Sequence, residues 1–171
     1  MKKAYTVVEL LVVISLIIIF SGIGIYFSQK TKQVNKLERA KIFLASKIHL
    51  ARSLALSPQK INGKQPFGFG ICIPSFPTNH FYLFADLDNN HQWTDNSETV
   101  EEFSLEKLTE ISSADLSVGS VFQLHLFFAF PDAKVYFNGD ESVKFAKITL
   151  KEKSSGREGE VYVNQLGQIS F

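Results

Sequence analysis

The chain opens with an apolar run, Tyr5-Thr6-Val7-Val8-Glu9-Leu10-Leu11-Val12-Val13-Ile14, which continues to Phe27 with Glu9 as its one charged residue. As a helix these 23 residues would extend about 35 Å at about 1.5 Å per residue, enough to cross a hydrocarbon core of about 30 Å. Lys2 and Lys3 precede the run, and the positive-inside rule therefore predicts a cytoplasmic N-terminus. The sequence predicts a transmembrane helix over residues 5–27.

Two simpler interpretations of this run are a secretory signal peptide and a plain signal anchor. A signal peptide has a shorter apolar core followed by a small-residue cleavage site, which does not fit the run to Phe27. A plain anchor leaves Glu9 unexplained, because a carboxylate inside an apolar span costs about 2.5–3.5 kcal/mol at mid-helix and less near the interface. A free α-amino group on a neighbouring chain would be a suitable partner for that carboxylate.

Residues 3–14 closely resemble the class III signal of type IV prepilins and type II secretion pseudopilins. The resemblance implies that a prepilin peptidase cuts between Ala4 and Tyr5, removes the leader 1–4 and methylates the new N-terminus at Tyr5. It also implies an assembly role for Glu9, whose counterpart in the family pairs with the terminal amine of an adjacent subunit. Ala4 replaces the usual glycine and Tyr5 the commoner phenylalanine or methionine, so we expect cleavage to proceed more slowly.

Residues 28–57 contain no glycine or proline and are predicted to continue the helix as an amphipathic segment. Pro58 predicts its end, because proline disfavours the α conformation in the residue before it. Residues 46–56 look like the LxxARSxA stretch of the GspH/FimT group of minor pseudopilins and pilins. Apolar residues recur at three- and four-residue steps and form one stripe that needs a globular surface to cover it: Leu37, Ala40, Leu44, Ile48, Ala51 and Ala55.

Charge is strongly segregated, although the whole chain carries only +1. Residues 28–64 contain nine basic residues and one acidic residue, a net charge of +8, whereas residues 65–171 contain seven basic and fifteen acidic residues, a net charge of −8. We expect the basic stretch to face anionic lipid head groups and the acidic heads of neighbouring subunits. A solvated helix face and a nucleic-acid surface are the alternatives. Because the acidic head would repel phosphate, no nucleic-acid partner is expected.

Residues 58–171 read as a β-rich globular head, since short apolar and β-branched runs alternate there with turn residues. We expect one antiparallel sheet packed on the outer half of the helix, which gives an α+β pilin fold. The segment 122–130 is expected to be its most buried strand, and Asn138-Gly139 a tight hairpin turn. The predicted strands are 67–73, 80–85, 98–104, 121–130, 134–137, 143–151, 158–164 and 168–171.

The most chemically distinctive stretch is the acidic segment 86–98. Oxygen-bearing side chains recur there at alternate positions and are followed by a glutamate, a pattern that suits Ca²⁺. It departs from the EF-hand loop, because His91 occupies the position of the sharp-turn glycine and the glutamate falls one place late. We therefore expect a structural turn rich in Asp and Asn, with a Ca²⁺ site as the alternative and no other cofactor. The candidate ligands are Asp86, Asp88, Asn90 and Glu98.

Catalysis lacks a recognisable constellation, so we do not expect an enzyme. The four histidines are scattered without metal-ligand spacing, and no nucleophile elbow or phosphate-binding glycine loop occurs. His125 alternates within an apolar strand and is expected to be a satisfied sheet residue. Cys72, the only cysteine, is expected to be a small buried hydrophobe.

Together the patterns predict a structural subunit, a minor pseudopilin or pilin of a type II secretion pseudopilus or type IV pilus, that assembles through its N-terminal helix and supports protein secretion. Its expected partners are other subunits, a prepilin peptidase and the bacterial inner membrane, with a single pass and the head outside the cytoplasm. The alternative is a surface-displayed pilin acting as an adhesin or a DNA-uptake module.

Overall fold

A computed structural model describes the backbone of residues 7–57, 59–61 and 63–171, and the side chains of the same residues except 22–35. The predicted leader, residues 1–4, and the predicted cleavage site between Ala4 and Tyr5 lie outside the described residues. The chain divides into two compact units, residues 1–35 and 36–171, which are considered separately. The division falls inside the segment 28–57 that the sequence assigns to an amphipathic helix.

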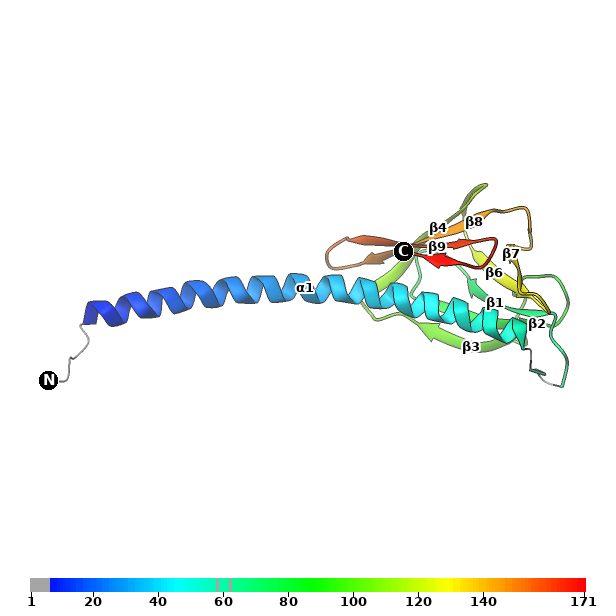
Figure 1. Ribbon diagram of the computed structural model, residues 1–171, viewed down its shortest axis with the longest axis horizontal. Helices are drawn as coiled ribbons and strands as arrows, with labels where there is room; N and C mark the ends of the chain where they lie inside the picture. Colours follow the sequence, from blue (N-terminus) through cyan, green and yellow to red (C-terminus); the bar gives the residue numbers. More distant parts are fainter. Residues whose placement is uncertain (1–6, 58, 62) are drawn as a thin grey trace. The chain divides into compact units, whose positions relative to one another are not determined.

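Helix α1 runs from Val7 to Leu56 (Figure 1). It contains no proline, and it ends two residues before Pro58, as the sequence predicts. In the second unit its apolar stripe is buried, which confirms the spacing argument. Its buried members are Leu37, Ala40, Leu44, Ile48, Ala51 and Ala55.

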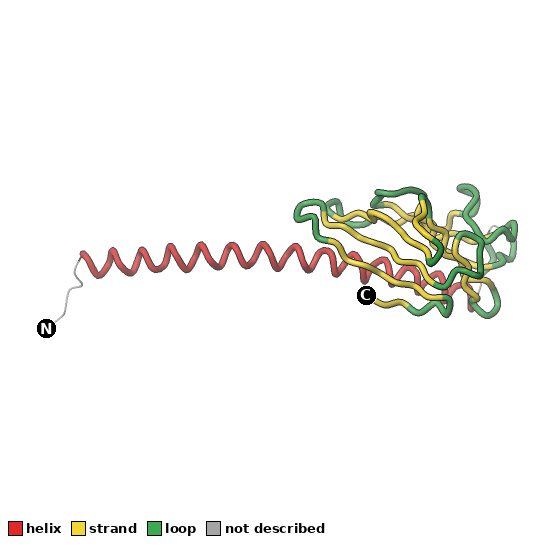
Figure 2. The backbone as a smooth tube through the Cα atoms, turned by 90° about the horizontal axis from the view of Figure 1, so that it is seen from above, coloured by secondary structure: helices red, strands yellow, loops and turns green. Residues whose placement is uncertain are grey.

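The strands of the second unit form two antiparallel sheets of five strands each, seen beside the helix in Figure 2. The first sheet has the order β3-β2-β1-β6-β7, with β1 Gly68–Ile73, β2 His80–Asp86, β3 Thr99–Ser104, β6 Leu124–Ala129 and β7 Lys134–Phe137. The second has the order β10-β9-β8-β4-β5, with β4 Thr109–Leu116, β5 Gly119–Val121, β8 Phe145–Glu152, β9 Glu158–Asn164 and β10 Ile169–Ser170.

The main core lies between the helix stripe and the inner faces of both sheets. Successive residues of a strand point to opposite faces, so Phe69, Ile71 and Ile73 of β1 enter this core. Cys72 points the other way and forms a second buried cluster with Phe84 and Phe127. The first sheet is therefore buried on both faces, which explains why every residue of β1 is buried.

Two glycines of β1 make room for the second cluster. A Cβ added to Gly70 would lie 2.5 Å from a ring carbon of Phe84, closer than side-chain atoms approach. A Cβ added to Gly68 would meet the ring of Phe127 and the backbone of Phe128. The Phe84 and Phe127 rings, which stack with centroids 6.1 Å apart, thus lie directly over the backbone of β1.

The predicted turn at Asn138-Gly139 is confirmed. Both residues have positive φ, 51° and 80°, as a two-residue hairpin turn of this type requires. The flanking Phe137 and Asp140 exchange two backbone hydrogen bonds of 3.0 and 2.9 Å. The segment 122–130 was expected to be the most buried strand, but β6 covers only Leu124–Ala129, Phe122 before it is 95% exposed and Phe130 after it is 45% exposed. The strand that is buried at every position is β1.

The predicted pilin fold, an α+β arrangement of one long helix with a transmembrane half over a single sheet, is contradicted. The structure is mostly antiparallel β-sheet in two sheets, and its described residues contain no long apolar helix suited to a membrane. The second sheet was not predicted: its strands β4 and β5 were not recognised, and β8, β9 and β10 pair with one another and with β4 instead of with the first sheet. Ala114 and Asp115 belong to residue types that are depleted in strands, and a register shift between Ile111 and Ser113 breaks the alternation of apolar residues.

Candidate functional site

The acidic segment 86–98 connects β2 to β3 and brings three of its four predicted ligands together. Oxygen atoms of Asp86, Asp88 and Glu98 all lie within 4.8 Å of one another. Asp86 ends β2 and Glu98 directly precedes β3, so the pairing of these two strands fixes the two carboxylates. The Ala85 N–H donates to the Glu98 carbonyl at 2.9 Å and closes the base of the loop.

Asp86 is buried and organises the first half of the loop. Its Oδ1 accepts the backbone N–H groups of Asp88 at 3.1 Å and Asn89 at 2.6 Å, and its Oδ2 accepts that of His91 at 2.9 Å. Burial raises the pKa of Asp86, while these three N–H groups favour the ionised form and oppose the shift. Asn89 and His91 have positive φ, 65° and 62°, so the carboxylate holds the chain in a conformation that such residues seldom adopt.

Glu98, also buried, fixes the second half of the loop. Its Oε1 accepts the Leu87 N–H at 3.0 Å and its Oε2 the Thr94 N–H at 2.9 Å. Burial is the main cause that raises the pKa of Glu98, and the charges of Asp88 and Asp86 add to it. The two buried carboxylates therefore act as acceptors for backbone groups of the loop that would otherwise lack partners.

Asp88 and Asn90 form the exposed part of the loop. Asp88 accepts the backbone N–H of Asn90 at 3.2 Å and its side-chain amide at 2.9 Å. The Asn90 amide oxygen instead accepts the Gln92 N–H at 2.7 Å. Asn90 thus presents a donor rather than an acceptor to the Asp88 carboxylate, unlike a Ca²⁺ ligand.

The carboxylate oxygens of this cluster are chemically suitable ligands for Ca²⁺, but they already accept hydrogen bonds from the protein backbone. Ca²⁺ takes six to eight oxygen ligands, and each oxygen of Asp86 and Glu98 accepts at least one backbone N–H. A carboxylate oxygen has a second lone pair, so the cluster retains some capacity for a cation. The hydrogen bonds support the structural turn as the main role, and the Ca²⁺ site stays a prediction.

The loop covers the second buried cluster with two aromatic side chains. Trp93 stacks on Tyr82 with centroids 5.5 Å apart, and His91 lies against Phe127 and Tyr136 at 5.0 and 4.2 Å. Without this loop the outer face of the first sheet would expose its phenylalanines. The buried carboxylates of Asp86 and Glu98 therefore serve to hold this covering loop in shape.

His125 anchors the loop to β6. Its Nδ1 accepts the Trp93 backbone N–H at 3.0 Å, and its own backbone N–H donates to Asn138 Oδ1 at 2.7 Å. Burial lowers the pKa of His125 to about 4, so the imidazole is neutral at pH 7 with its proton on Nε2. The expectation of a satisfied sheet histidine is confirmed. The hydrogen-bond partner of its Nδ1, Trp93, lies 32 residues away in the chain and could not be identified from the sequence.

The second candidate site is the apolar surface of α1 in the first unit. Every described side chain from residue 7 to 21 is exposed, and the twelve large apolar ones range from 46% for Ile14 to 79% for Val7. Because they occupy almost every position, they cover all faces of the helix. Glu9 lies in its first turn, where a carboxylate interacts favourably with the helix dipole.

The predicted membrane location is contradicted. Among the residues that the structure describes, no helix combines the length and the apolar character needed to cross a bilayer. The expected transmembrane helix 5–27, the single pass and the inner-membrane location are therefore corrected.

Comparison with known proteins adds no family assignment. No protein-family model matches the sequence, and neither the curated proteins nor the solved structures yielded a significant match. The resemblance of residues 3–14 to the class III signal remains an interpretation of those residues.

Proposed function

We propose that this chain is a structural subunit of a filament, of the minor pseudopilin or pilin kind, that assembles through residues 7–20 and serves protein secretion or a pilus. Processing by a prepilin peptidase between Ala4 and Tyr5 belongs to the same proposal and rests on the resemblance of residues 3–14. The proposed partners are other subunits and the peptidase.

One observation carries the proposal, the exposed apolar helix surface over residues 7–20. Fully burying one Val, Leu, Ile or Phe side chain contributes about 1.5–3 kcal/mol. Covering half of the twelve would contribute roughly 10 kcal/mol, from which the cost of association is subtracted. A surface that is apolar on all faces suits a helix enclosed by several neighbours, and the same segment of adjacent subunits supplies an enclosure of matching chemistry.

Glu9 is the proposed register residue. Its carboxylate would pair with the methylated amine of Tyr5 on the neighbouring subunit, a role implied by the resemblance. In an apolar enclosure, removing one member of an ion pair costs about 3–5 kcal/mol. Such a pair would favour one axial offset between subunits over the others.

The test compares two isoleucines of α1 that are equally exposed, Ile17 and Ile42, at 58% each. We expect Ile17→Asp to abolish assembly of the full chain, because it places a charge inside the proposed interface. We expect Ile42→Asp to assemble as the wild type does, since it lies outside residues 7–20. High-speed pelleting and electron microscopy measure the outcome. Wild-type assembly by Ile17→Asp would refute the proposal.

A binding module remains the second candidate because of Phe122. A phenylalanine that is 95% exposed offers an aromatic surface that a ligand could cover. The net charge of −8 over residues 65–171 disfavours DNA as that ligand. Loss of surface adhesion in Phe122→Ser with assembly unchanged would favour this alternative.

A further inference from the structure

Strand β3 forms one edge of the first sheet, and four of its six positions are exposed. Just after it, the Leu105 N–H donates to the Asn79 carbonyl at 2.8 Å, toward the β2 side. The backbone groups of an antiparallel strand alternate in direction, so those of Ser104 and Glu102 are directed away from β2, to the side where the sheet ends. The edge of β3 therefore offers backbone donors and acceptors to a further strand.

The other edges of the two sheets offer less. At the opposite edge of the first sheet, Phe137 of β7 exchanges backbone hydrogen bonds of 3.0 and 2.9 Å with Asp140, which occupies the groups that point away from β6. In the second sheet the edge strands β5 and β10 have only three and two residues. With six residues, β3 is the longest edge strand in the described part of the chain. Its pairing with β2 is regular over residues 101–104, up to a register shift at Leu83 and Phe84.

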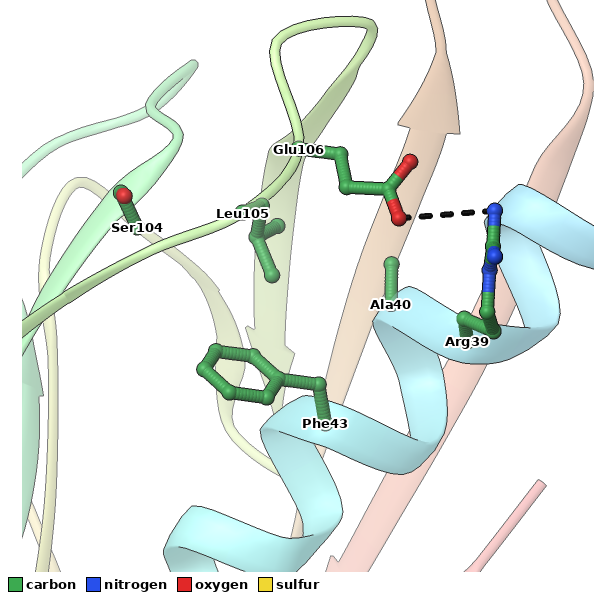
Figure 3. Close-up of a pocket in the computed structure, with 6 residues that line it drawn as sticks. All are labelled: Arg39, Ala40, Phe43, Ser104, Leu105 and Glu106. Carbon is green, nitrogen blue, oxygen red and sulfur yellow. Dashed lines mark ion pairs between the residues drawn. The ribbon is translucent and has the colours of Figure 1, made fainter.

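A pocket of about 270 Å³ lies at the end of this edge, between α1 and the residues that follow β3 (Figure 3). Ala40, Phe43 and Leu105 give it apolar walls, and Arg39 forms an ion pair of 3.5 Å with Glu106 across one side. Pockets for drug-sized ligands have volumes of about 300–1,000 Å³. This smaller pocket is therefore suited to a single apolar side chain.

The pocket lies where side chains of an added strand would point. Phe103 pairs with Phe81 of β2, and the Phe43 ring of α1 contacts both rings at 6.1 Å between centroids. Cross-strand neighbours point to the same face of a sheet. In a strand added beside β3, the residues opposite Phe103 and Leu105 would therefore point toward Phe43 and the pocket.

The charges on β3 define the chemistry of such a strand. The Glu102 carboxylate contacts His80 Nδ1 at 3.0 Å, whereas the exposed Glu101 has no ion pair among the residues that the structure describes. The nearby Lys47 ammonium lies over the Phe103 ring, 4.1 Å from its centroid. A basic residue opposite Glu101 would supply the missing partner. Pairing of β3 with β3 of a second copy would instead bring glutamates together, which disfavours the chain as its own partner.

We propose that β3 binds an extended segment of another protein as an added antiparallel strand, with a large apolar side chain in the pocket and a basic residue opposite Glu101. In this mode of recognition backbone hydrogen bonds provide affinity, and pockets for alternate side chains provide specificity. A small molecule or a helix could enter the pocket but would leave the backbone groups of Glu102 and Ser104 unused. This contact is separate from assembly through residues 7–20.

A synthetic peptide of seven residues tests the contact with the full chain. It has leucine at its second and fourth positions, lysine at its sixth and threonine elsewhere, so that antiparallel pairing places the lysine opposite Glu101 and the leucines opposite Phe103 and Leu105. Fluorescence anisotropy of the labelled peptide measures its affinity. Methylation of the amide nitrogens of its third and fifth residues, which would face Ser104 and Glu102, should weaken binding about tenfold.

A charge reversal in the protein tests the basic position. Glu101→Lys should weaken binding of this peptide about threefold and strengthen binding of a counterpart that has glutamate at its sixth position. The matched control is Glu158→Lys, which makes the same change at an exposed residue of β9 and should alter neither affinity. Equal effects of the two substitutions would mean that only net charge attracts the peptide, and the pairing with Glu101 would be overturned.

Amide hydrogen exchange locates the bound peptide. We expect slower exchange over residues 99–106 and no change over residues 7–20. Protection confined to residues 7–20, equal binding of the methylated peptide, or no saturable binding would overturn the proposal. Protection of residues 99–106 that grows with protein concentration in the absence of peptide would identify a second copy as the occupant and also overturn it. Peptide-dependent protection of residues 99–106 in a chain that does not assemble would support this contact and overturn the proposed function alone.

Discussion

Replacing His125 by glutamine should remove a specific acid sensitivity of the fold. In the folded protein burial lowers the pKa of His125 to about 4, against an ordinary value of 6.5. The unfolded chain therefore binds the proton more readily between these two values, and the free energy of unfolding falls as the pH is lowered through that window. Its described neighbours, the Phe84 ring, the Trp93 N–H and the Asn138 amide, offer no charge to compensate.

The magnitude follows from these two pKa values. Between pH 7 and pH 4.5 the linkage relation gives a loss of about 2 kcal/mol from His125 alone. Other groups titrate in the same range, so the informative quantity is the difference between the wild type and His125→Gln at each pH. We expect the variant to be less stable at pH 7, where its amide replaces a fitted imidazole, and this deficit to shrink by about 2 kcal/mol at pH 4.5.

The assay is urea unfolding followed by the fluorescence of Trp93, the only tryptophan. Its backbone donates directly to His125, so the probe reports on the region that is perturbed. A deficit of equal size at pH 7 and pH 4.5 would show that His125 is not held neutral by burial, and the account of the loop anchor would fail.

Three further predictions concern the second unit. Gly70→Ala should lower the midpoint of urea unfolding by the equivalent of about 1–3 kcal/mol, because its Cβ would meet Phe84 at 2.5 Å. An unchanged midpoint would contradict the steric argument. Glu152 accepts hydrogen bonds from Ser154 and Ser155, which lower its pKa to about 2. Its contribution to the free energy of unfolding should therefore disappear as the pH falls from about 4.5 to 2. If Glu152→Gln lost stability with falling pH just as the wild type does, this role of Glu152 would be contradicted. Adding Ca²⁺ should raise the melting temperature only slightly, by the equivalent of about 1 kcal/mol for a weak site, whereas a shift of many degrees that Asp88→Ala removes would establish a calcium site.

Sequence patterns were most informative where one physical requirement dominates. The stripe from Leu37 to Ala55 follows the helical period, and the strand 158–164 follows strict alternation, so both were predicted with their bounds. Strand β4 was missed because its buried residues, including Ile111 and Ala114, are separated by serines and a register shift. Nor did the sequence indicate that β8, β9 and β10 pair with one another and with β4 as a separate sheet.

The candidate site shows the same limit. The spacing of oxygen-bearing residues identified Asp86, Asp88 and Glu98, which the structure brings together. The role of the loop as a cover depends on contacts that only the folded chain creates, such as Trp93 with His125. A local pattern can indicate that carboxylates converge, but not which surface the resulting loop protects.

The covering loop has a consequence for how this protein can be altered. Connections between strands usually tolerate changes of length, yet shortening the segment 87–97 would uncover the phenylalanines on the outer face of the first sheet. The β8–β9 turn is different, because a Cβ added at Gly156 would meet nothing within 4 Å. An epitope or fluorescent tag inserted at Gly156 should leave the fold undisturbed, whereas the same insertion after Asn90 should not.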